Sequence, residues 1–478
     1  MRQILAEFFL SLGLSSFFIF LIRKKAIERG WLSYPREDRW HKKPIALYGS
    51  VGIILAIYPV TLFFLHLQLK FKVFLFFSFL IFILGLLDDI RPLSPSFKFI
   101  LEIAISSFII FLGGRLTITG RFLIDVLITY LWILGITNAF NLLDNIDGLS
   151  SGIGIISGLS LVILFLLSHN TDLSFHLIFI LLGAYSGYLI FNFPPAKIFM
   201  GDGGSLFLGF TLSILSIPGY LNNLNKDIIS TLSIILIFSI PIFDTILVTL
   251  NRLYFGKKAT EGGKDHTSHR LLYMGLSEIR VNISLYLISL IGGLVGIYLY
   301  FTPGIGIFLG ILYLLFLFLF GIYLSKLNIY KTYPKGFIFM LEEVLAKIRA
   351  SEIVVDTIII GGAYYFAFFL HYEGVKRLFG DVYVTTLPFA IFISLIFLFF
   401  TGIYKGGWDM PSFDKIERLI FAIILTDITI KIVTLYLSVS SVKWEVLITF
   451  NLIWFFLIIL SRSIFLYFDY LIEKMKKR

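Results

Sequence analysis

The stretch FKVFLFFSFLIFILGLLDDI, residues 71–90, predicts a helix that crosses a membrane and ends in an acidic pair. Its apolar part, residues 71–87, is close to the length of about twenty residues that spans a bilayer. Asp88 and Asp89 follow it directly. Two adjacent carboxylates beside a low-dielectric slab are costly unless a cation or a water-filled cleft compensates them, so they are candidates for function. The alternative is a solvated helix end.

The composition extends this interpretation to the whole chain. Of its 478 residues, 58% are hydrophobic, 17% are aromatic and 15% are charged, and the mean hydropathy is +0.93. A soluble globular protein is far less apolar. The net charge of +10 comes from Lys and Arg in short gaps and forms no continuous stripe, so nucleic acid is not expected as a partner. Because cysteine is absent, any metal must use oxygen or imidazole ligands.

The fold predicted from the apolar runs is an all-α polytopic membrane protein with about fifteen transmembrane helices. The runs are residues 4–22, 47–66, 71–87, 97–113, 123–140, 152–168, 174–191, 205–219, 228–250, 281–299, 304–325, 353–371, 383–402, 418–438 and 446–467. The first run lacks a small-residue cleavage site and is expected to be retained. Every second gap holds roughly thirty Lys and Arg against about nine in the others, which places the amino terminus outside and the carboxyl terminus in the cytoplasm.

This orientation puts the polar gaps 23–46, 88–96, 141–151, 192–204 and 251–280 together on the cytoplasmic face of the inner (plasma) membrane. The basic, amphipathic stretch 326–352 is expected to be an interfacial helix and linker. It would separate residues 1–325, a catalytic bundle of about eleven helices, from residues 353–478, a module of about four helices.

A row of polar residues begins at the end of the fifth apolar run, in the segment NAFNLLDNIDGL, residues 138–149. Asn138, Asn141 and Asp144 are spaced by three residues and would share one face of a helix, with Asp147 continuing the row. Amides and carboxylates on one face predict a binding surface. A polar helix cap followed by a glycine turn is the alternative.

The segment NFPPAKIFMGDGGS, residues 192–205, surrounds Asp202 with three glycines. Glycines let the backbone approach a ligand closely and expose N–H donors. Ser205 can cap the next helix, whose positive dipole end suits phosphate, and Lys197 adds a basic group. We expect Asp202 to bind a metal that bridges phosphates. A glycine-rich turn between helices is the alternative.

The segment GGKDHTSHR, residues 262–270, predicts an anion-binding loop. His266, His269 and Arg270 follow a glycine pair and a lysine, and together they can neutralise a diphosphate. Zinc is not expected, because no further histidine or thiol lies nearby. Histidines in a solvated loop are the alternative. The first predicted loop, residues 36–44, is typical of a basic patch attracted to anionic lipid.

Together these segments predict a magnesium-dependent site of phosphoryl transfer, with Mn²⁺ as the alternative metal. Carboxylates would hold the cation, and basic groups would bind a diphosphate. The site would also be open to the membrane, so that a lipid substrate could enter. Phosphoryl transfer requires mainly that two anions are held in line and that their repulsion is cancelled, which this set of residues can do.

These motifs resemble the polyprenyl-phosphate N-acetylhexosamine-1-phosphate transferase family, which includes the muramoyl-pentapeptide transferase of peptidoglycan synthesis. The resemblance covers about residues 1–325 and is carried by Leu86–Ile90, Asn138–Leu149, Asn192–Gly209 and His266–Leu271. It implies that undecaprenyl phosphate attacks the β-phosphate of a UDP-sugar. UMP would leave, and the lipid-linked sugar diphosphate would start a cell-envelope glycan.

The resemblance also implies residue roles. Asp88 is the expected base or activator of the lipid phosphate, Asp89 is its companion near the metal, and Asp202 is the magnesium ligand. The full expected sets are Asp88, Asp89 and Asp202 for catalysis; Asn138, Asn141, Asp144, Asp147, Lys197, His266, His269 and Arg270 for substrate binding; and Asp202, Asp89 and Asp144 for metal. Whether an aspartate forms a covalent phospho-sugar intermediate is left open.

Two segments depart from the family pattern. Ala46 and Leu47 stand where relatives often carry proline and arginine, and Gly49-Ser50 stands where they carry two glycines, so no catalytic residue is assigned there. The sequence His-Thr-Ser-His-Arg lacks the consecutive histidines of the pentapeptide transferase. This difference favours UDP-GlcNAc as donor, with the pentapeptide transferase reaction as the alternative.

Residues 353–478 lie beyond the family's usual end and are similar to the membrane module that precedes nucleotide-sugar epimerase and dehydratase domains. No dinucleotide-binding fingerprint appears after residue 467, so a non-catalytic docking module for a glycan-biosynthesis enzyme is expected. The rival class is a transporter or flippase of lipid-linked anions, which would place ionisable residues near the bilayer midplane and show repeated halves. The expected partners are the UDP-sugar, polyprenyl phosphate and the bilayer; a homodimer is left open.

Overall fold

The computed structural model describes residues 2–34, 43–257, 263–327, 350–372, 381–404, 412–436 and 442–476. Within these ranges the chain forms 17 helices and one two-stranded sheet. It divides into two compact units, Met1–Arg252 with Lys258–Tyr300, and Leu253–Lys257 with Phe301–Arg478. The prediction of a helical membrane protein is therefore confirmed, with one short hairpin added.

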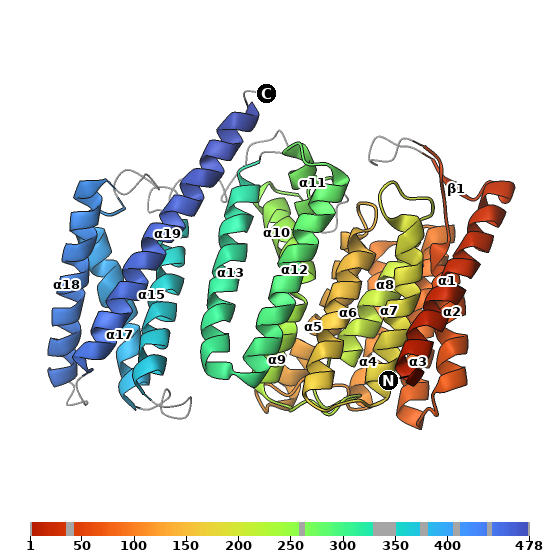
Figure 1. The fold of residues 1–478 in the computed structure, drawn as a ribbon, viewed down its shortest axis with the longest axis horizontal. Coiled ribbons are helices and arrows are strands. Elements are labelled where there is room, and N and C mark those ends of the chain that lie inside the picture. Colours follow the sequence, from red (N-terminus) through yellow and green to blue (C-terminus); the bar gives the residue numbers. More distant parts are fainter. Residues whose placement is uncertain are drawn as a thin grey trace. The chain divides into compact units, whose positions relative to one another are not determined.

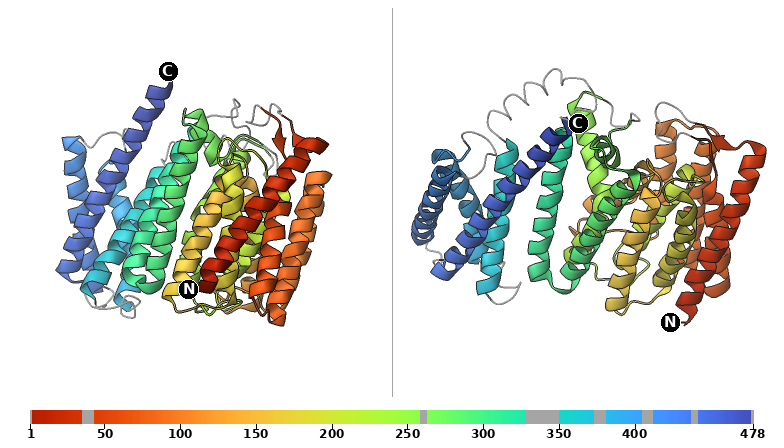
Figure 2. Two further views of the ribbon diagram at one scale, coloured as in Figure 1. Left: turned by 45° about the vertical axis from the view of Figure 1, so that its right-hand side comes forward. Right: turned by 45° about the horizontal axis from the view of Figure 1, so that its top comes forward.

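The first unit contains α1 to α12 and both strands (Figure 1). The bounds are α1 Arg2–Arg29, β1 Leu32–Ser33, β2 Ile45–Ala46, α2 Gly49–Phe64, α3 Leu69–Ile90, α4 Pro95–Phe111, α5 Phe122–Leu143, α6 Leu149–Leu167, α7 Leu173–Asn192, α8 Gly201–Leu215, α9 Ile228–Ile237, α10 Ser239–Tyr254, α11 Thr267–Tyr273 and α12 Glu278–Phe301. The antiparallel hairpin β1–β2 and α11 lie at one end of this unit, and the N-terminus lies at the other, as the turned views in Figure 2 also show.

Helix α8 is buried on all sides. Every residue from Gly203 to Leu215 is buried, as expected for a helix that is apolar all round. It packs between α3 and α5, while α1 packs along α7 and α2. The hairpin also reaches the segment before α8, because Ala46 forms a bridge with Ile198. The start of α8 is therefore fixed by elements from several parts of the sequence.

Two helices of this unit begin with side-chain caps, which satisfy N–H groups that lack intrahelical partners. At α4, Ser94 Oγ accepts a hydrogen bond from the Phe97 N–H, and Pro95 occupies the first turn. At α9, Asp227 Oδ1 accepts from the Ser230 N–H at 2.7 Å. These caps explain why both helices start where they do.

Ten helices of the described residues are long and apolar enough to cross a membrane, or 11 if the bent pair α9–α10 counts as one span. The sequence predicts about fifteen spans, and each of its apolar runs overlaps one helix, except that the run 228–250 forms the bent pair α9–α10. However, α2, α4 and α8 have only 16, 17 and 15 residues, which is short for a bilayer. Helix α18 is also outside this set. The chain is a polytopic membrane protein, and the larger number of spans stays a prediction.

The second unit contains α13 Pro303–Ser325, α15 Ala350–His371, α17 Asp381–Phe400, α18 Phe413–Tyr436 and α19 Trp444–Lys476. Helix α15 packs against α13, α17 and α19, and α17 packs against α18. The sequence analysis assigns α13 to the first domain, whereas here it packs within the second unit. Most of the predicted linker, 326–352, lies outside the described residues, so the predicted domain boundary stays a prediction.

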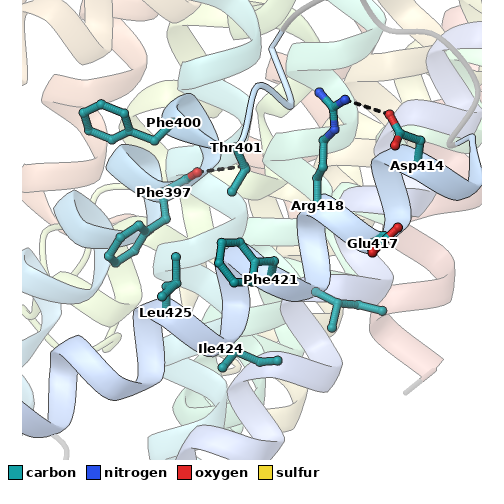
Figure 3. A pocket seen from close by; sticks show the side chains of 10 residues that line it. Phe397, Phe400, Thr401, Asp414, Glu417, Arg418, Phe421, Ile424 and Leu425 are labelled. Atoms are coloured by element: carbon teal, nitrogen blue, oxygen red, sulfur yellow. Dashed lines mark hydrogen bonds and ion pairs between the residues drawn. The ribbon is translucent and has the colours of Figure 1, made fainter.

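A groove with a volume of about 710 Å³ lies between α17 and α18 of the second unit (Figure 3). Phe397, Phe421 and Ile424 line its apolar wall. At its rim, Arg418 pairs with Asp414 at 2.8 Å. None of the residues that the sequence analysis assigns to the active site lines this groove.

Gly85 in α3 generates a prediction about packing, because it lies against the backbone at the start of α8. A Cβ added there would come within 2.5 Å of the Asp202 carbonyl carbon. We expect Gly85→Ala to push α3 away from α8 and to lower the free energy of unfolding by about 1–3 kcal/mol. The midpoint of thermal unfolding in detergent measures the change. Gly135→Ala in α5 is the matched control, since a Cβ there meets nothing within 4 Å. Equal midpoints for both variants would contradict this account of the packing.

Candidate active site

The acidic pair at the end of α3 has two different environments. Asp89 accepts hydrogen bonds from the backbone N–H groups of Asp202, at 2.9 Å, and of Gly203, at 3.1 Å. It thereby caps the N-terminus of α8, where N–H groups lack helical partners and the dipole favours a negative charge. Gly201 has a φ of 72°, and a Cβ there would lie 2.3 Å from Asp89 Oδ2, so the close approach requires glycine.

Asp88, the other member of the pair, meets Asp202 at the side chain of Lys98 in α4. The Lys98 Nζ lies 3.2 Å from Asp88 Oδ2 and also pairs with Asp202 Oδ2. Asp88 Oδ1 accepts a hydrogen bond from the Leu93 N–H at 2.6 Å. The side chain of Lys98 is 13% exposed, so one largely buried ammonium joins two carboxylates from α3 and α8.

The polar row of α5 reaches both α4 and α8. Asn138 Nδ2 donates to Glu102 Oε2 at 2.5 Å, and Asn141 Nδ2 donates to Ser205 Oγ at 3.0 Å. Glu102 is 1% exposed and lies on α4. Two members of the predicted row therefore connect α5 to the helices that carry Lys98 and Asp202.

The turn after α5 is held by hydrogen bonds to three other parts of the chain: the segment before α8, α7 and α12. Asp147 Oδ2 accepts from the Ala196 N–H at 2.7 Å, which joins this turn to the segment before α8. The Gly148 N–H donates to Asn192 Oδ1 at 2.8 Å, and Asn282 Nδ2 donates to the Asp147 carbonyl at 2.7 Å. The position of Asp147 is thus fixed by α7 and α12.

The environment of Asp144 includes the negative charges of other acidic side chains. Burial, and then the negative charges of Asp202, Asp89 and Asp147, raise the pKa of Asp144 well above its ordinary value. These carboxylates come from three separate segments of the sequence. The structure therefore brings them close together at one end of the first unit.

The histidine loop is anchored by Asp244 in α10. Asp244 Oδ2 lies 2.8 Å from His266 Nδ1, and Asp244 Oδ1 accepts from the Thr267 N–H at 2.7 Å. Asp244 is 1% exposed. It caps the start of α11 in the same way that Asp89 caps α8, and so fixes where the loop ends.

Ser268 connects this loop to the acidic end of α5, because its Oγ donates to Asn145 Oδ1 at 2.6 Å. Beside it, burial and then the charge of His266 lower the pKa of His269 to about 4. The His269 ring is therefore neutral at neutral pH. A neutral imidazole can donate or accept a hydrogen bond but supplies no charge to a phosphate.

Arg270 and Lys197, both expected to bind substrate, differ in exposure. Arg270 is fully buried, and its Nε donates to the Asp265 carbonyl at 2.9 Å. Asp265 in turn accepts two hydrogen bonds from Arg252, at 2.7 and 2.8 Å. Lys197 is exposed, and its side chain makes no hydrogen bond or ion pair within the described residues. The basic patch predicted at 36–44 lies, except for its last two residues, outside the described ranges.

The donor set at the start of α8 fits a small divalent cation. Asp144 and Asp202 offer carboxylate oxygens, which Mg²⁺ prefers, and burial followed by nearby negative charge raises the pKa of Asp144, so a cation beside it would favour its ionised form. Across the described parts of the chain, no three acidic or histidine side chains form a closed metal cage. Phosphate oxygens would therefore complete the coordination, as is usual for Mg²⁺. Asp89, expected as a third ligand, already accepts from α8 with both oxygens.

Three residues of this region are not predicted from the sequence: Lys98, Glu102 and Asp244. Each is an ionisable side chain inside a run of apolar residues. That placement is itself a signal, because a charge within the membrane is costly and tends to be retained for function. A prediction based only on the polar gaps between apolar runs does not include such residues.

Comparisons with known proteins agree on one family. Residues 71–220 match the family described as Glycosyl transferase family 4, a range that includes Asp88, Lys98, Asp144 and Asp202. The probable undecaprenyl-phosphate N-acetylglucosaminyl 1-phosphate transferase of Bacillus subtilis is 33% identical over 301 residues, which cover 61% of this chain and 83% of that protein.

Two further relatives match over different lengths. The decaprenyl-phosphate N-acetylglucosaminephosphotransferase of Mycolicibacterium smegmatis is 28% identical, with 59% of this chain and 79% of the relative covered. The phospho-N-acetylmuramoyl-pentapeptide-transferase of Latilactobacillus sakei is 35% identical, with 34% of this chain and 49% of the relative covered. The chain therefore belongs to the polyprenyl-phosphate N-acetylhexosamine-1-phosphate transferase family, the membrane sugar-1-phosphate transferases of glycosyl transferase family 4.

Proposed function

We propose that this chain transfers N-acetylglucosamine 1-phosphate from UDP-GlcNAc to undecaprenyl phosphate and releases UMP. The observation that carries the proposal is the junction at which Lys98 joins Asp88 and Asp202, close to Asp144. A reaction between two phosphates needs positive charge and carboxylates that can hold a cation in one place, and this junction offers both. Family membership supports the reaction class.

The choice of donor rests on the relatives and on the histidine loop. The two relatives named for N-acetylglucosamine phosphate transfer are covered over 83% and 79% of their lengths, whereas the pentapeptide transferase is covered over 49%. The loop sequence His-Thr-Ser-His-Arg also lacks consecutive histidines. Both features favour an N-acetylhexosamine donor over the peptidoglycan precursor.

In the proposed reaction, an oxygen of the lipid phosphate forms a bond to the β-phosphorus of the donor, and the bond from that phosphorus to the oxygen shared with the α-phosphate breaks. UMP leaves with that oxygen. Asp88 is placed to orient the lipid phosphate or take up its remaining proton, because it lies beside Lys98 at the end of α3. The Lys98 ammonium adds positive charge close to the reacting phosphates, whichever carboxylate it pairs with.

Asp202 and Asp144 would hold the magnesium ion. When bound, the ion neutralises charge on the donor diphosphate and orients it for in-line transfer. Asp89 positions Asp202 by fixing the first N–H groups of α8. Asn141 positions the same helix start through Ser205, and Asn138 connects to α4 through Glu102.

The loop of residues 263–270 would bind the UDP part of the donor. His269 is neutral and would hydrogen-bond a phosphate oxygen, while His266 is oriented by Asp244. Arg270 shapes the loop through the Asp265 carbonyl. Asp147 holds the turn next to it, and the exposed Lys197 is free to approach the donor from solvent.

We further infer that this end of the first unit faces the cytoplasm, where UDP-sugars are made. The bias of Lys and Arg toward every second gap supports this orientation. In this arrangement the short helices α2, α4 and α8 complete a bundle of about eleven spans, and residues 353–478 add about four. The second unit would serve as a docking module for another enzyme of glycan synthesis.

A panel of donors tests the proposed function. We expect the purified full chain, given undecaprenyl phosphate and Mg²⁺, to release UMP from UDP-GlcNAc at a higher rate than from UDP-glucose or UDP-MurNAc-pentapeptide. Nucleotide products are separated by ion-exchange chromatography. Without the lipid phosphate no UMP should appear. Release of UDP would show that the sugar–phosphate bond breaks instead, and absence of any nucleotide product would reject the transferase reaction.

Replacement of Asp202 tests the metal assignment. We expect Asp202→Asn to lower Mg²⁺-dependent UMP release by at least about a hundredfold, because a charged group that stabilises the transition state is lost. The backbone N–H of residue 202 remains to bond Asp89, so the fold should persist. Asp227→Asn is the control, since asparagine caps a helix as well as aspartate does. Near-normal activity of Asp202→Asn would contradict the assignment.

The lowered pKa of His269 predicts how stability depends on pH. Its value of about 4 in the folded protein lies below the ordinary value of 6.5, so the folded state binds fewer protons between these values. Stability from this group is present above pH 6.5 and is lost as the pH falls toward 4. We expect the thermal midpoint of His269→Gln to fall less between pH 6.5 and 4 than that of the unsubstituted chain. The exposed His66→Gln is the control, and parallel pH curves for all three proteins would contradict the prediction.

A further inference from the structure

Glu102 is a buried carboxyl group that the reaction described above does not use. It is 1% exposed, and its Oε2 accepts a hydrogen bond from Asn138 Nδ2 at 2.5 Å. Within the described residues, its Oε1 has no hydrogen-bond partner. A buried carboxylate oxygen without a partner costs free energy, so its retention in an apolar helix calls for a function.

Lys98 lies one helical turn before Glu102 on α4. Side chains four residues apart on a helix are neighbours, so the ammonium of Lys98 can reach the carboxylate of Glu102 by changing rotamer. In the structure, the ammonium instead pairs with Asp88 and Asp202. The Lys98 ammonium thus has two alternative sets of partners: the carboxylates of Asp88 and Asp202, or the carboxylate of Glu102.

We propose that Glu102 is the alternative counter-ion of Lys98, which receives the ammonium when a divalent cation binds Asp202. This inference rests on the metal assignment in the proposed function. Two cations that share one carboxylate repel each other, and the repulsion is strong where water is scarce. An ammonium displaced without a new partner would be a buried unpaired charge. Glu102 supplies that partner. Its hydrogen bond with Asn138 also connects it to the polar row of α5.

The competing explanation is that Glu102 is a neutral acid that only bonds Asn138. Glu102→Gln separates the two explanations, because glutamine has nearly the same shape and can still accept from Asn138, but it carries no negative charge. If the hydrogen bond is the whole function, this substitution changes nothing. If the charge receives Lys98, the substitution traps the ammonium on Asp88 and Asp202, where it competes with the metal.

The experiment measures Mn²⁺ binding to the purified full chain without substrates, from the electron paramagnetic resonance signal of free Mn²⁺. We expect Glu102→Gln to weaken binding about 10- to 100-fold, the range found when groups behind metal ligands are replaced. Lys98→Met should bind Mn²⁺ at least as tightly as the unsubstituted chain, because the competing ammonium is gone. Glu7→Gln is the matched control, since Glu7 is equally buried but pairs with His176 on α7.

The double variant Glu102→Gln, Lys98→Met distinguishes exchange from simple loss of nearby negative charge. With Lys98 absent, Glu102→Gln should no longer weaken Mn²⁺ binding, which a double-mutant cycle reports as coupling. The proposal is overturned if Glu102→Gln binds Mn²⁺ normally, if its loss persists without Lys98, or if the unsubstituted chain binds no Mn²⁺. UMP release is measured separately, so failure of the transferase reaction with this coupling intact would reject only the proposed function.

Discussion

The active site depends on the two hydrogen bonds that the Asp89 carboxylate accepts at the N-terminus of α8. Helix α8 is short, it is buried from Gly203 onward, and its first N–H groups lack intrahelical partners. A carboxylate from α3 satisfies two of them and matches the positive end of the helix dipole. This contact fixes the position of Asp202 in the first turn of α8. The meeting of Asp202 with Lys98 and Asp88 follows from it.

Burying these groups together creates an electrostatic problem that the protein solves only in part. Lys98 balances some of the negative charge of Asp88 and Asp202, while burial, and then the charges of Asp202, Asp89 and Asp147, raise the pKa of Asp144. Carboxylates buried near one another cost stability in the empty site, and the same carboxylates favour binding of a divalent cation. The candidate site thus suits a divalent cation, whose charge would offset the repulsion between these carboxylates and a phosphate.

The sequence predicts the helices well because long apolar runs have few alternatives to membrane helices. It also singles out Asp88 and Asp202, whose polar surroundings interrupt those runs. It does not reveal that Lys98 joins them, since this contact depends on how α4 packs against α3 and α8 in three dimensions. Nor does it show that the buried Arg270 faces its own loop. A residue type and its spacing indicate which chemistry is available, but the packing decides which group reaches the ligand.

The acidic pair of α3 illustrates that limit. Asp88 and Asp89 look equivalent in the sequence, yet successive side chains on a helix point about 100° apart, because a turn contains about 3.6 residues. The two carboxylates therefore point in different directions and meet different groups. Asp89 faces the backbone at the start of α8 and holds it in place, while Asp88 pairs with the side chain of Lys98. In the proposed site, the acidic pair of α3 thus combines one carboxylate that holds the helix start with one that is available for chemistry, and the rotation of the helix decides which is which.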